Sequence, residues 1–213
     1  GNAKLPGTLT LPNNTDSYPL IIFLHGSGPS DRNSSVGNFK PFETLAHALA
    51  ENGIATYRFD KKTFTNPQLY NADSLYTVKD EIHDDAYKTV DYFIDHQDYH
   101  FNEIILMGYS LSAGYLPQLL NHLSDKVDKG IMIAGSPRSL MELMEEQLIY
   151  LLDYNMGPHF NANYEVMLDS LAVLKEKAAN KTAKEEDIYL NVAYKYWKND
   201  AEYDAQAAFK QVK

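Results

Sequence analysis

Length, composition and charge limit what this chain can be. Its 213 residues are enough for one sizeable hydrophobic core. The formal net charge of −10, from 29 acidic and 19 basic residues, argues against a nucleic-acid partner, because phosphate backbones are bound through clustered Lys and Arg. Cysteine is absent, which excludes disulfides, thiolate catalysis and zinc held by cysteine.

The sequence predicts a soluble protein with no membrane span. Its longest apolar run, residues 20–24, is far shorter than the roughly 20 residues that a membrane-spanning helix requires. No signal-peptide pattern opens the sequence. Because the chain begins Gly1–Asn2 without Met, we expect its natural start to have been removed. Localisation therefore stays open between the cytoplasm and export after loss of an N-terminal segment.

The first two-thirds of the chain alternate between predicted strands and predicted helices. An alternating stretch, residues 8–11, ends at Pro12 and predicts an antiparallel edge strand. Apolar runs bounded by turn residues are typical of strands buried on both faces, as in a parallel sheet. These runs are residues 20–24, 54–59, 104–107 and 131–134.

Segments with helical spacing separate these runs and complete the α/β pattern. Their apolar positions are Phe42, Leu45, Ala46 and Leu49, with a stop at Asn52–Gly53; then Val78, Ile82, Ala86, Val90 and Phe93; then Tyr115, Leu116, Leu119, Leu120 and Leu123. Strands and helices in alternation imply right-handed crossovers. We therefore predict an α/β fold with a doubly wound, mostly parallel sheet.

After Gly135 the pattern turns helical for about 60 residues. Ser139 and Glu142 have the spacing of a capping box at the start of the first of these helices. The predicted helices cover residues 140–151, 164–174 and 188–197. We expect residues 1–137 to form the N-terminal part of the core, residues 138–200 a helical cap inserted over the sheet, and residues 201–213 the start of a truncated return to the core.

A serine-containing turn joins the strand at residues 104–107 to the next helix. Gly108-Tyr109-Ser110-Leu111-Ser112 has the strand–turn–helix context of a nucleophile elbow, whose strained centre requires small residues on both sides. Ser110 is the predicted nucleophile, at the positive end of the following helix. A rival register makes Ser112 the nucleophile, although two further residues carry it into the first helical turn.

A glycine-rich loop follows the strand at residues 20–24. Its sequence His25-Gly26-Ser27-Gly28 is of the type that supplies one backbone N–H to an oxyanion hole, the other coming from the residue after the nucleophile. We assign these roles to Ser27 and Leu111, with Gly28 as an alternative to Ser27. His25 fits a structural role in this loop better than that of a general base.

Two acidic features have mainly structural interpretations. Asp60 closes the strand at residues 54–59, where it could face the active-site crevice, but a turn or salt-bridge role is favoured. Residues 80–85, DEIHDD, offer metal-ligating side chains, yet their helical spacing indicates a solvated helix face.

Taken together, these motifs resemble the α/β-hydrolase superfamily, within it a bacterial group related to dienelactone hydrolases and acyl-peptide-type hydrolases. The similar segments are residues 25–32 (HGSGPSDR), 53–62 (GIATYRFDKK), 108–111 (GYSL) and 133–138 (IAGSPR). The resemblance implies hydrolysis of carboxylic esters or related acyl groups without a cofactor, with Ser110 as nucleophile. Two departures stand out: Tyr109 replaces a frequent His, and Ser112 and Ala113 replace a glycine pair.

The base that Ser110 needs is not where the family pattern places it. In this fold the chain order is Ser, acid, His, and the histidines after Ser110 are His122, at the far end of the next helix, and His159, in the predicted cap. We expect that the chain ends before the last strands, so that the acid and His are not present and the chain alone is weak or inactive. The sheet edge left exposed favours self-association.

Three functional hypotheses remain at this point. The first is a serine-dependent acyl hydrolase that acts on small-molecule esters or acyl compounds through an acyl-enzyme on Ser110. The second is a peptidase or amidase using the same serine, and the third a non-catalytic binding module. The substrate is not predicted, because the aromatic residues of the helical region could line a pocket or pack in a core, and packing is favoured for most. They are Tyr150, Tyr154, Tyr164, Tyr189, Tyr194, Tyr196 and Trp197.

Overall fold

The computed structural model describes residues 5–13, 17–70, 75–96, 98–155 and 157–212. The chain divides into two compact units. The sheet unit consists of Gly1–Pro67, Lys79–Pro137 and Asp204–Lys213, and the helical unit of Gln68–Val78 and Arg138–Tyr203. No helix within the described ranges is both long enough and apolar enough to cross a membrane.

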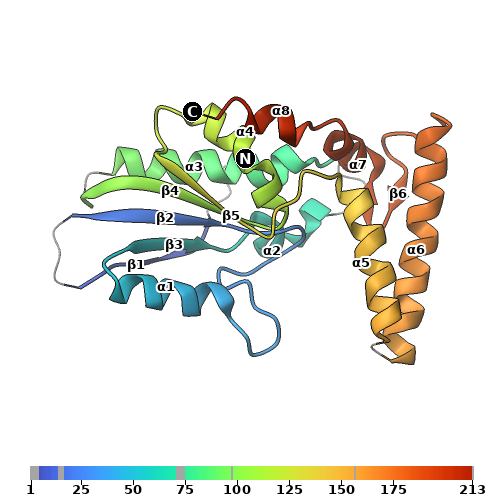
Figure 1. The fold of residues 1–213 in the computed structure, drawn as a ribbon, viewed down its shortest axis with the longest axis horizontal. Helices are drawn as coiled ribbons and strands as arrows, with labels where there is room; N and C mark the ends of the chain where they lie inside the picture. Colours follow the sequence, from blue (N-terminus) through green and yellow to red (C-terminus); the bar gives the residue numbers. More distant parts are fainter. Residues whose placement is uncertain (1–4, 14–16, 71–74, 97, 156, 213) are drawn as a thin grey trace. The chain divides into compact units, whose positions relative to one another are not determined.

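The sheet unit is built on a five-stranded sheet of order β1-β3-β2-β4-β5 (Figure 1). Its strands are β1 (Gly7–Thr10), β2 (Tyr18–Leu24), β3 (Ala55–Phe59), β4 (Phe101–Tyr109) and β5 (Lys129–Ile133). β1 pairs antiparallel with β3 at one edge, and the other pairings are parallel. The predicted α/β class, the mostly parallel sheet and the antiparallel edge strand are therefore confirmed.

The strand register sets where the loops after the strands meet. β2 and β4 are paired through Phe23↔Met107 and Leu24↔Gly108, so the two strands end level with each other. The loop that begins at His25 consequently lies beside the turn that contains Ser110. β5 ends at the same, carboxyl-terminal end of the sheet, with Ile133 paired to Tyr109.

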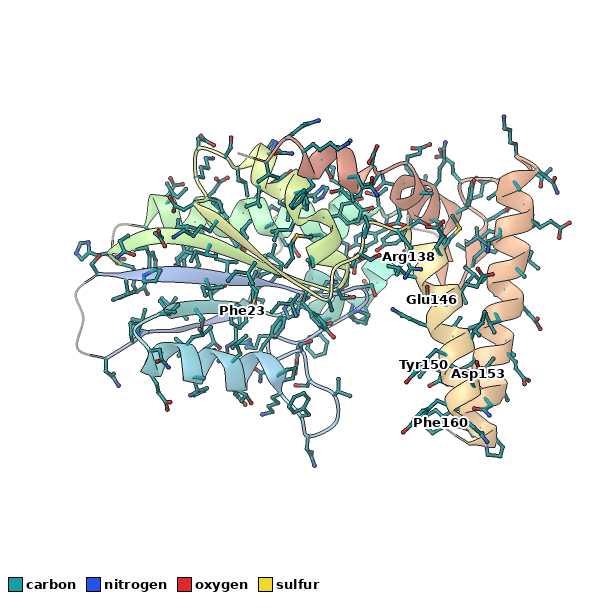
Figure 2. All side chains as sticks on the ribbon, viewed as in Figure 1. Phe23, Arg138, Glu146, Tyr150, Asp153 and Phe160 are labelled. Atoms are coloured by element: carbon teal, nitrogen blue, oxygen red, sulfur yellow. The ribbon has the colours of Figure 1, made fainter. Side chains whose placement is uncertain are left out.

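Helices cover both faces of the sheet (Figure 1). They are α1 (Pro41–Glu51), α3 (Asp84–Asp95) and α4 (Leu111–His122). The sheet unit also contains the short helices α2 (Lys62–Thr65) and α8 (Ala205–Phe209) and a π-helical turn at Lys79–His83. A 3₁₀ turn at Pro67–Tyr70 begins in the sheet unit and continues in the helical unit. On one face, Phe42 and Ala46 of α1 pack against Phe23 and Met107. Figure 2 labels Phe23 among the side chains of the sheet unit. On α4, Asn121 Nδ2 donates to the Ala208 carbonyl of α8 at 2.9 Å.

One predicted buried strand is exposed. Residues 131–134 were expected to be covered on both faces, but Ile131, Met132 and Ile133 are 39%, 46% and 38% exposed. The physical reason is position, because β5 is the last strand in the order and pairs with β4 alone among the described strands. Self-association through this edge stays a prediction.

The helical unit contains a helical hairpin and a small β-hairpin. Its elements are α5 (Leu140–Tyr154), α6 (Pro158–Ala179), β6 (Ile188–Tyr189), β7 (Val192–Ala193) and α7 (Tyr194–Ala201). Both halves of the predicted capping box are present: the Ser139 side chain accepts from the Glu142 N–H, and the Glu142 carboxylate accepts from the Ser139 N–H. The role of residues 138–200 as a cap over the sheet, and of 201–213 as a return to the core, stay predictions.

The third helix predicted in this region, residues 188–197, is wrong in its first half. Leu190 and Asn191 have φ of 53° and 64°, which suit a two-residue hairpin turn that reverses the chain between β6 and β7. The helix begins only at Tyr194.

The aromatic residues of this unit divide between core and surface. Tyr189 and Trp197 pack with Leu171 and Leu174, and Tyr196 is also buried. The prediction that they pack in the core therefore holds for these residues. Tyr164 and Tyr194 are partly buried, whereas Tyr150 of α5 (Figure 2) and Tyr154 are each 66% exposed and do not pack in the core.

Replacing Leu106 by Ala tests the core of the sheet unit. Leu106 is fully buried on the interior strand β4, so we expect the truncation to lower the free energy of unfolding by about 2–5 kcal/mol. Urea denaturation followed by circular dichroism measures the loss. Val36→Ala is the control, because Val36 is 74% exposed and should change stability by less than about 0.5 kcal/mol. Equal losses for the two variants would contradict this description of the core.

Candidate active site

Ser110 lies in a strained turn between β4 and α4. Its φ of 53° and ψ of −114° place it in a backbone region that side-chain-bearing residues rarely occupy. Two backbone hydrogen bonds hold the turn: the Ser110 N–H donates to the Ile133 carbonyl at 2.9 Å, and the Gly114 N–H donates to the Ser110 carbonyl at 3.2 Å. The sheet and the helix thus fix the serine from both sides.

Close backbone packing explains the glycines around this turn. A Cβ on Gly108 would lie 2.8 Å from the Cα and N atoms of Ala113, and a Cβ on Gly135 would lie 2.7 Å from the Ala113 Cβ. Such distances are shorter than any normal contact between atoms. The start of α4 can therefore lie this close to β4 and to the end of β5 only because positions 108 and 135 are glycine. The small residue expected two positions before the nucleophile, Gly108, is therefore required here by geometry.

Ser112, where the family pattern has a small residue, has a structural contact of its own. It is buried in the first turn of α4, and its hydroxyl donates to the His25 carbonyl. This hydrogen bond ties α4 to the glycine-rich loop after β2. Because the hydroxyl is buried and already donates, the geometry argues against the alternative register in which Ser112 is the nucleophile.

The glycine-rich loop packs directly against Ser110. A Cβ on Gly26 would lie 3.2 Å from the Ser110 Cβ and 3.6 Å from the Ser110 Oγ. His25, at the start of the loop, donates from Nε2 to the Phe59 carbonyl at 2.7 Å. Burial, reinforced by the nearby charge of Lys61, lowers the pKa of His25 to about 4. The ring is thus neutral at pH 7 and anchors the loop to the end of β3, in agreement with its predicted structural role.

The backbone N–H groups of the site have different surroundings. The Gly28 N–H donates to the Glu81 carboxylate at 2.9 Å, so it is already occupied and is a poor alternative to Ser27. Within the described ranges, neither the Ser27 N–H nor the Leu111 N–H donates a hydrogen bond. Leu111 is the first residue of α4, where a helix leaves its amides unpaired.

Asp60 is held in an ion pair with Arg32. It accepts from the Arg32 N–H at 2.7 Å and from the Arg32 guanidinium at 3.0 and 2.7 Å. These side-chain hydrogen bonds lower the pKa of Asp60. The favoured salt-bridge interpretation of Asp60 is therefore the one that the structure shows.

The expectation that residues 80–85 form a solvated helix face is wrong for Glu81, His83 and Asp85, which are buried. Lys61 pairs with Glu81 at 2.5 Å, and Lys62 pairs with Asp85 at 3.3 Å. Sequence reasoning missed these pairs, because burial of the acids depends on two lysines contributed by another segment. The available signal was two adjacent lysines after a strand and two acids spaced one helical turn apart.

Neither downstream histidine is a described partner of Ser110. His122 is exposed at the end of α4, with its ring 4.3 Å from that of Tyr87. His159 is exposed on α6, in the helical unit. Among the residues that the structure describes, none accepts a hydrogen bond from the Ser110 Oγ. The described residues thus provide a strained serine and two nearby segments whose Ser27 and Leu111 amides donate no hydrogen bond, without an acid or a histidine bonded to the serine.

A doubly wound sheet whose central strand runs through a strained serine into a helix is the architecture of the α/β-hydrolases. No protein-family model matches the chain. Esterase EstD of Thermotoga maritima is 33% identical over 173 residues, which are 81% of this chain and 39% of that protein. The chain thus spans about two-fifths of the length of this relative.

A solved structure supports the fold. The α/β hydrolase GrgF from Penicillium sp. sh18 matches with a TM-score of 0.53 at 11% identity, covering 98% of this chain and 72% of that one. A dienelactone hydrolase from Anabaena variabilis is 23% identical over 64% of this chain and 60% of its own, with a TM-score of 0.45. The chain thus has the α/β-hydrolase fold and is similar to an esterase over 81% of its length.

Replacing Gly108 by Ala tests the close approach of α4 to β4. The new methyl group would meet the Ala113 backbone, so we expect a loss of about 1–3 kcal/mol in the free energy of unfolding, measured in urea. Gly130→Ala on β5 is the matched control. A Cβ there would lie 2.6 Å from the Leu120 Cδ1, the end of a flexible side chain that can turn away. A smaller loss for Gly108→Ala than for Gly130→Ala would show that the approach is not rigid.

The lowered pKa of His25 predicts a pH-dependent stability. Because the folded-state pKa is about 4 and the ordinary value is 6.5, the unfolded chain takes up a proton first as the pH falls. Stability attributable to the neutral ring is complete above pH ~6.5 and falls by about 1.4 kcal/mol per pH unit down to pH ~4. The free energy of unfolding of wild type minus that of His25→Gln should therefore shrink between pH 7 and 4.5. A constant difference would contradict the burial of a neutral ring.

Proposed function

We propose that this protein is a serine-dependent acyl hydrolase that cleaves carboxylic esters of small molecules through an acyl-enzyme on Ser110. The observation that carries the proposal is the strained backbone of Ser110, held at the edge of the sheet where β4 passes into α4. The relation to an esterase over 81% of the chain supports ester hydrolysis as the general reaction.

Each part of the site has a role in the proposed reaction. The Ser110 Oγ attacks the carbonyl carbon of the ester, and the developing oxyanion accepts hydrogen bonds from the Ser27 and Leu111 N–H groups. The positive end of the α4 dipole stabilises the same charge. The alcohol leaves, and water then releases the acid from Ser110. This chemistry needs no cofactor.

The proton of the Ser110 hydroxyl must go to a base, and none of the described residues accepts a hydrogen bond from this hydroxyl. A serine without a base loses several orders of magnitude in rate even where the oxyanion donors remain. We therefore expect little or no turnover from the 213 residues alone, and the experiments that follow use the full-length protein.

Labelling with a fluorophosphonate tests the nucleophile. We expect mass spectrometry to locate the phosphonyl group on Ser110, and Ser110→Ala to lose both the label and more than about 1000-fold of the esterase rate. Ser112→Gly is the control for register, because it removes the neighbouring hydroxyl and leaves the turn. Label on Ser112, or label that persists in Ser110→Ala, would rule out the proposal.

The same preparation separates ester from amide hydrolysis. The proposal expects faster turnover, as kcat/KM, for p-nitrophenyl esters of short acids than for aminoacyl amides with the same leaving group. Faster amide turnover that disappears in Ser110→Ala would assign the site to a peptidase or amidase instead.

A further inference from the structure

The buried ion pair between Lys61 and Glu81 contacts the backbone of the loop beside Ser110. The Lys61 Nζ donates to the Gly26 carbonyl at 2.7 Å and to the Glu81 Oε1 at 2.5 Å. The same Glu81 Oε1 accepts from the Gly28 N–H at 2.9 Å. The pair therefore grips the backbone on both sides of Ser27, at the carbonyl before it and the amide after it.

The contact to the Gly26 carbonyl also sets the direction of the Ser27 N–H. These two groups belong to one planar peptide unit, and in a trans peptide the C=O and the N–H point in opposite directions. No cis peptide is present among the described residues. With the carbonyl turned inward to Lys61, the Ser27 N–H is turned away from Lys61. If this peptide flipped, a carbonyl oxygen would take the place of the amide donor and would repel an oxyanion.

Burial shows that stability alone is a poor explanation for this pair. The Lys61 and Glu81 side chains are only 3% and 1% exposed. Removing two charges from water costs several kcal/mol per ion, and well-packed apolar residues are often as stable or more so. What apolar residues cannot do is donate to the Gly26 carbonyl and accept from the Gly28 amide.

We propose that Lys61 and Glu81 are positioning residues that lock the Gly26–Ser27 peptide, so that the Ser27 N–H stays available to the oxyanion. This inference rests on the proposed function of the site. Lys61 adds a second effect: its positive charge polarises the peptide through the Gly26 carbonyl and makes the Ser27 N–H a stronger donor. Neither side chain touches substrate.

The neighbouring ion pair offers a matched control. Lys62 and Asp85 are the next lysine and the next acid, 3.3 Å apart, with side chains that are 11% and 3% exposed. Neither hydrogen-bonds to the backbone of residues 25–28. Replacing this pair removes two buried charges and leaves the loop contacts in place.

The experiment compares Lys61→Met/Glu81→Gln with Lys62→Met/Asp85→Asn in the full-length protein. For the first variant we expect kcat for a p-nitrophenyl ester to fall about 10- to 100-fold with KM changed by less than about threefold. The inhibition constant of a boronic acid, which forms a tetrahedral adduct on the serine, should rise in proportion. The second variant should lose comparable stability in urea and keep kcat within about twofold.

The outcomes separate this inference from the proposed function. If Ser110→Ala keeps wild-type turnover, the proposed function fails and the inference with it. If turnover depends on Ser110 while folded Lys61→Met/Glu81→Gln keeps kcat within about twofold, the positioning role alone is overturned, as it is if the control pair loses kcat equally. If the double variant does not fold, the single variant Glu81→Gln tests the positioning role instead. This variant keeps an oxygen that can accept from the Gly28 N–H, but it removes the counter-charge of Lys61. An unchanged kcat and an unchanged boronate affinity would overturn the inference.

Discussion

The backbone strain at Ser110 is the constraint on which the site depends. A residue held at φ 53° and ψ −114° costs about 1–3 kcal/mol, and it persists only where its surroundings leave no alternative. Here the surroundings are a hydrogen bond to the Ile133 carbonyl and the contact of Gly108 with the start of α4. The buried apolar faces of β2 and β4 supply the stability that offsets the strain. Relaxing the turn would therefore require separating α4 from the sheet.

The loop beside Ser110 is fixed by parts of the chain that are distant in sequence. The His25 ring donates to β3 at the Phe59 carbonyl, and the His25 carbonyl accepts from Ser112 on α4. These contacts are possible because parallel strands end at one edge of the sheet, so that the segments following β2, β3 and β4 meet there. The loop is thus anchored at the same end of the sheet as the serine, and for the same topological reason.

Local patterns made the strands, the turn at Ser110 and the glycine-rich loop predictable from the sequence. Strand, glycine and serine signals lie within a few residues of one another, and the capping box at Ser139 is equally local. What could not be predicted depends on partners elsewhere. Glu81 is buried because Lys61 reaches it from another segment, and residues 131–133 are exposed because β5 is the last strand in the order. The hairpin at Leu190 and Asn191 overrode a helical spacing, which residues 188–193 satisfy by coincidence.

In the proposed reaction, the oxyanion would meet dipoles instead of a net charge. Lys61 is neutralised by Glu81, and His25 next to it stays uncharged because burial lowers its pKa to about 4. An unpaired cation at this depth would attract any anion, including the carboxylate product of ester hydrolysis. Oriented amides distinguish the tetrahedral oxyanion from the substrate carbonyl by the position of the oxygen. A donor that lies about 2.7–3.1 Å from the oxyanion lies farther from the carbonyl oxygen of the unreacted ester. A paired lysine that orients a peptide therefore assists the transition state more selectively than a free lysine in the same place would.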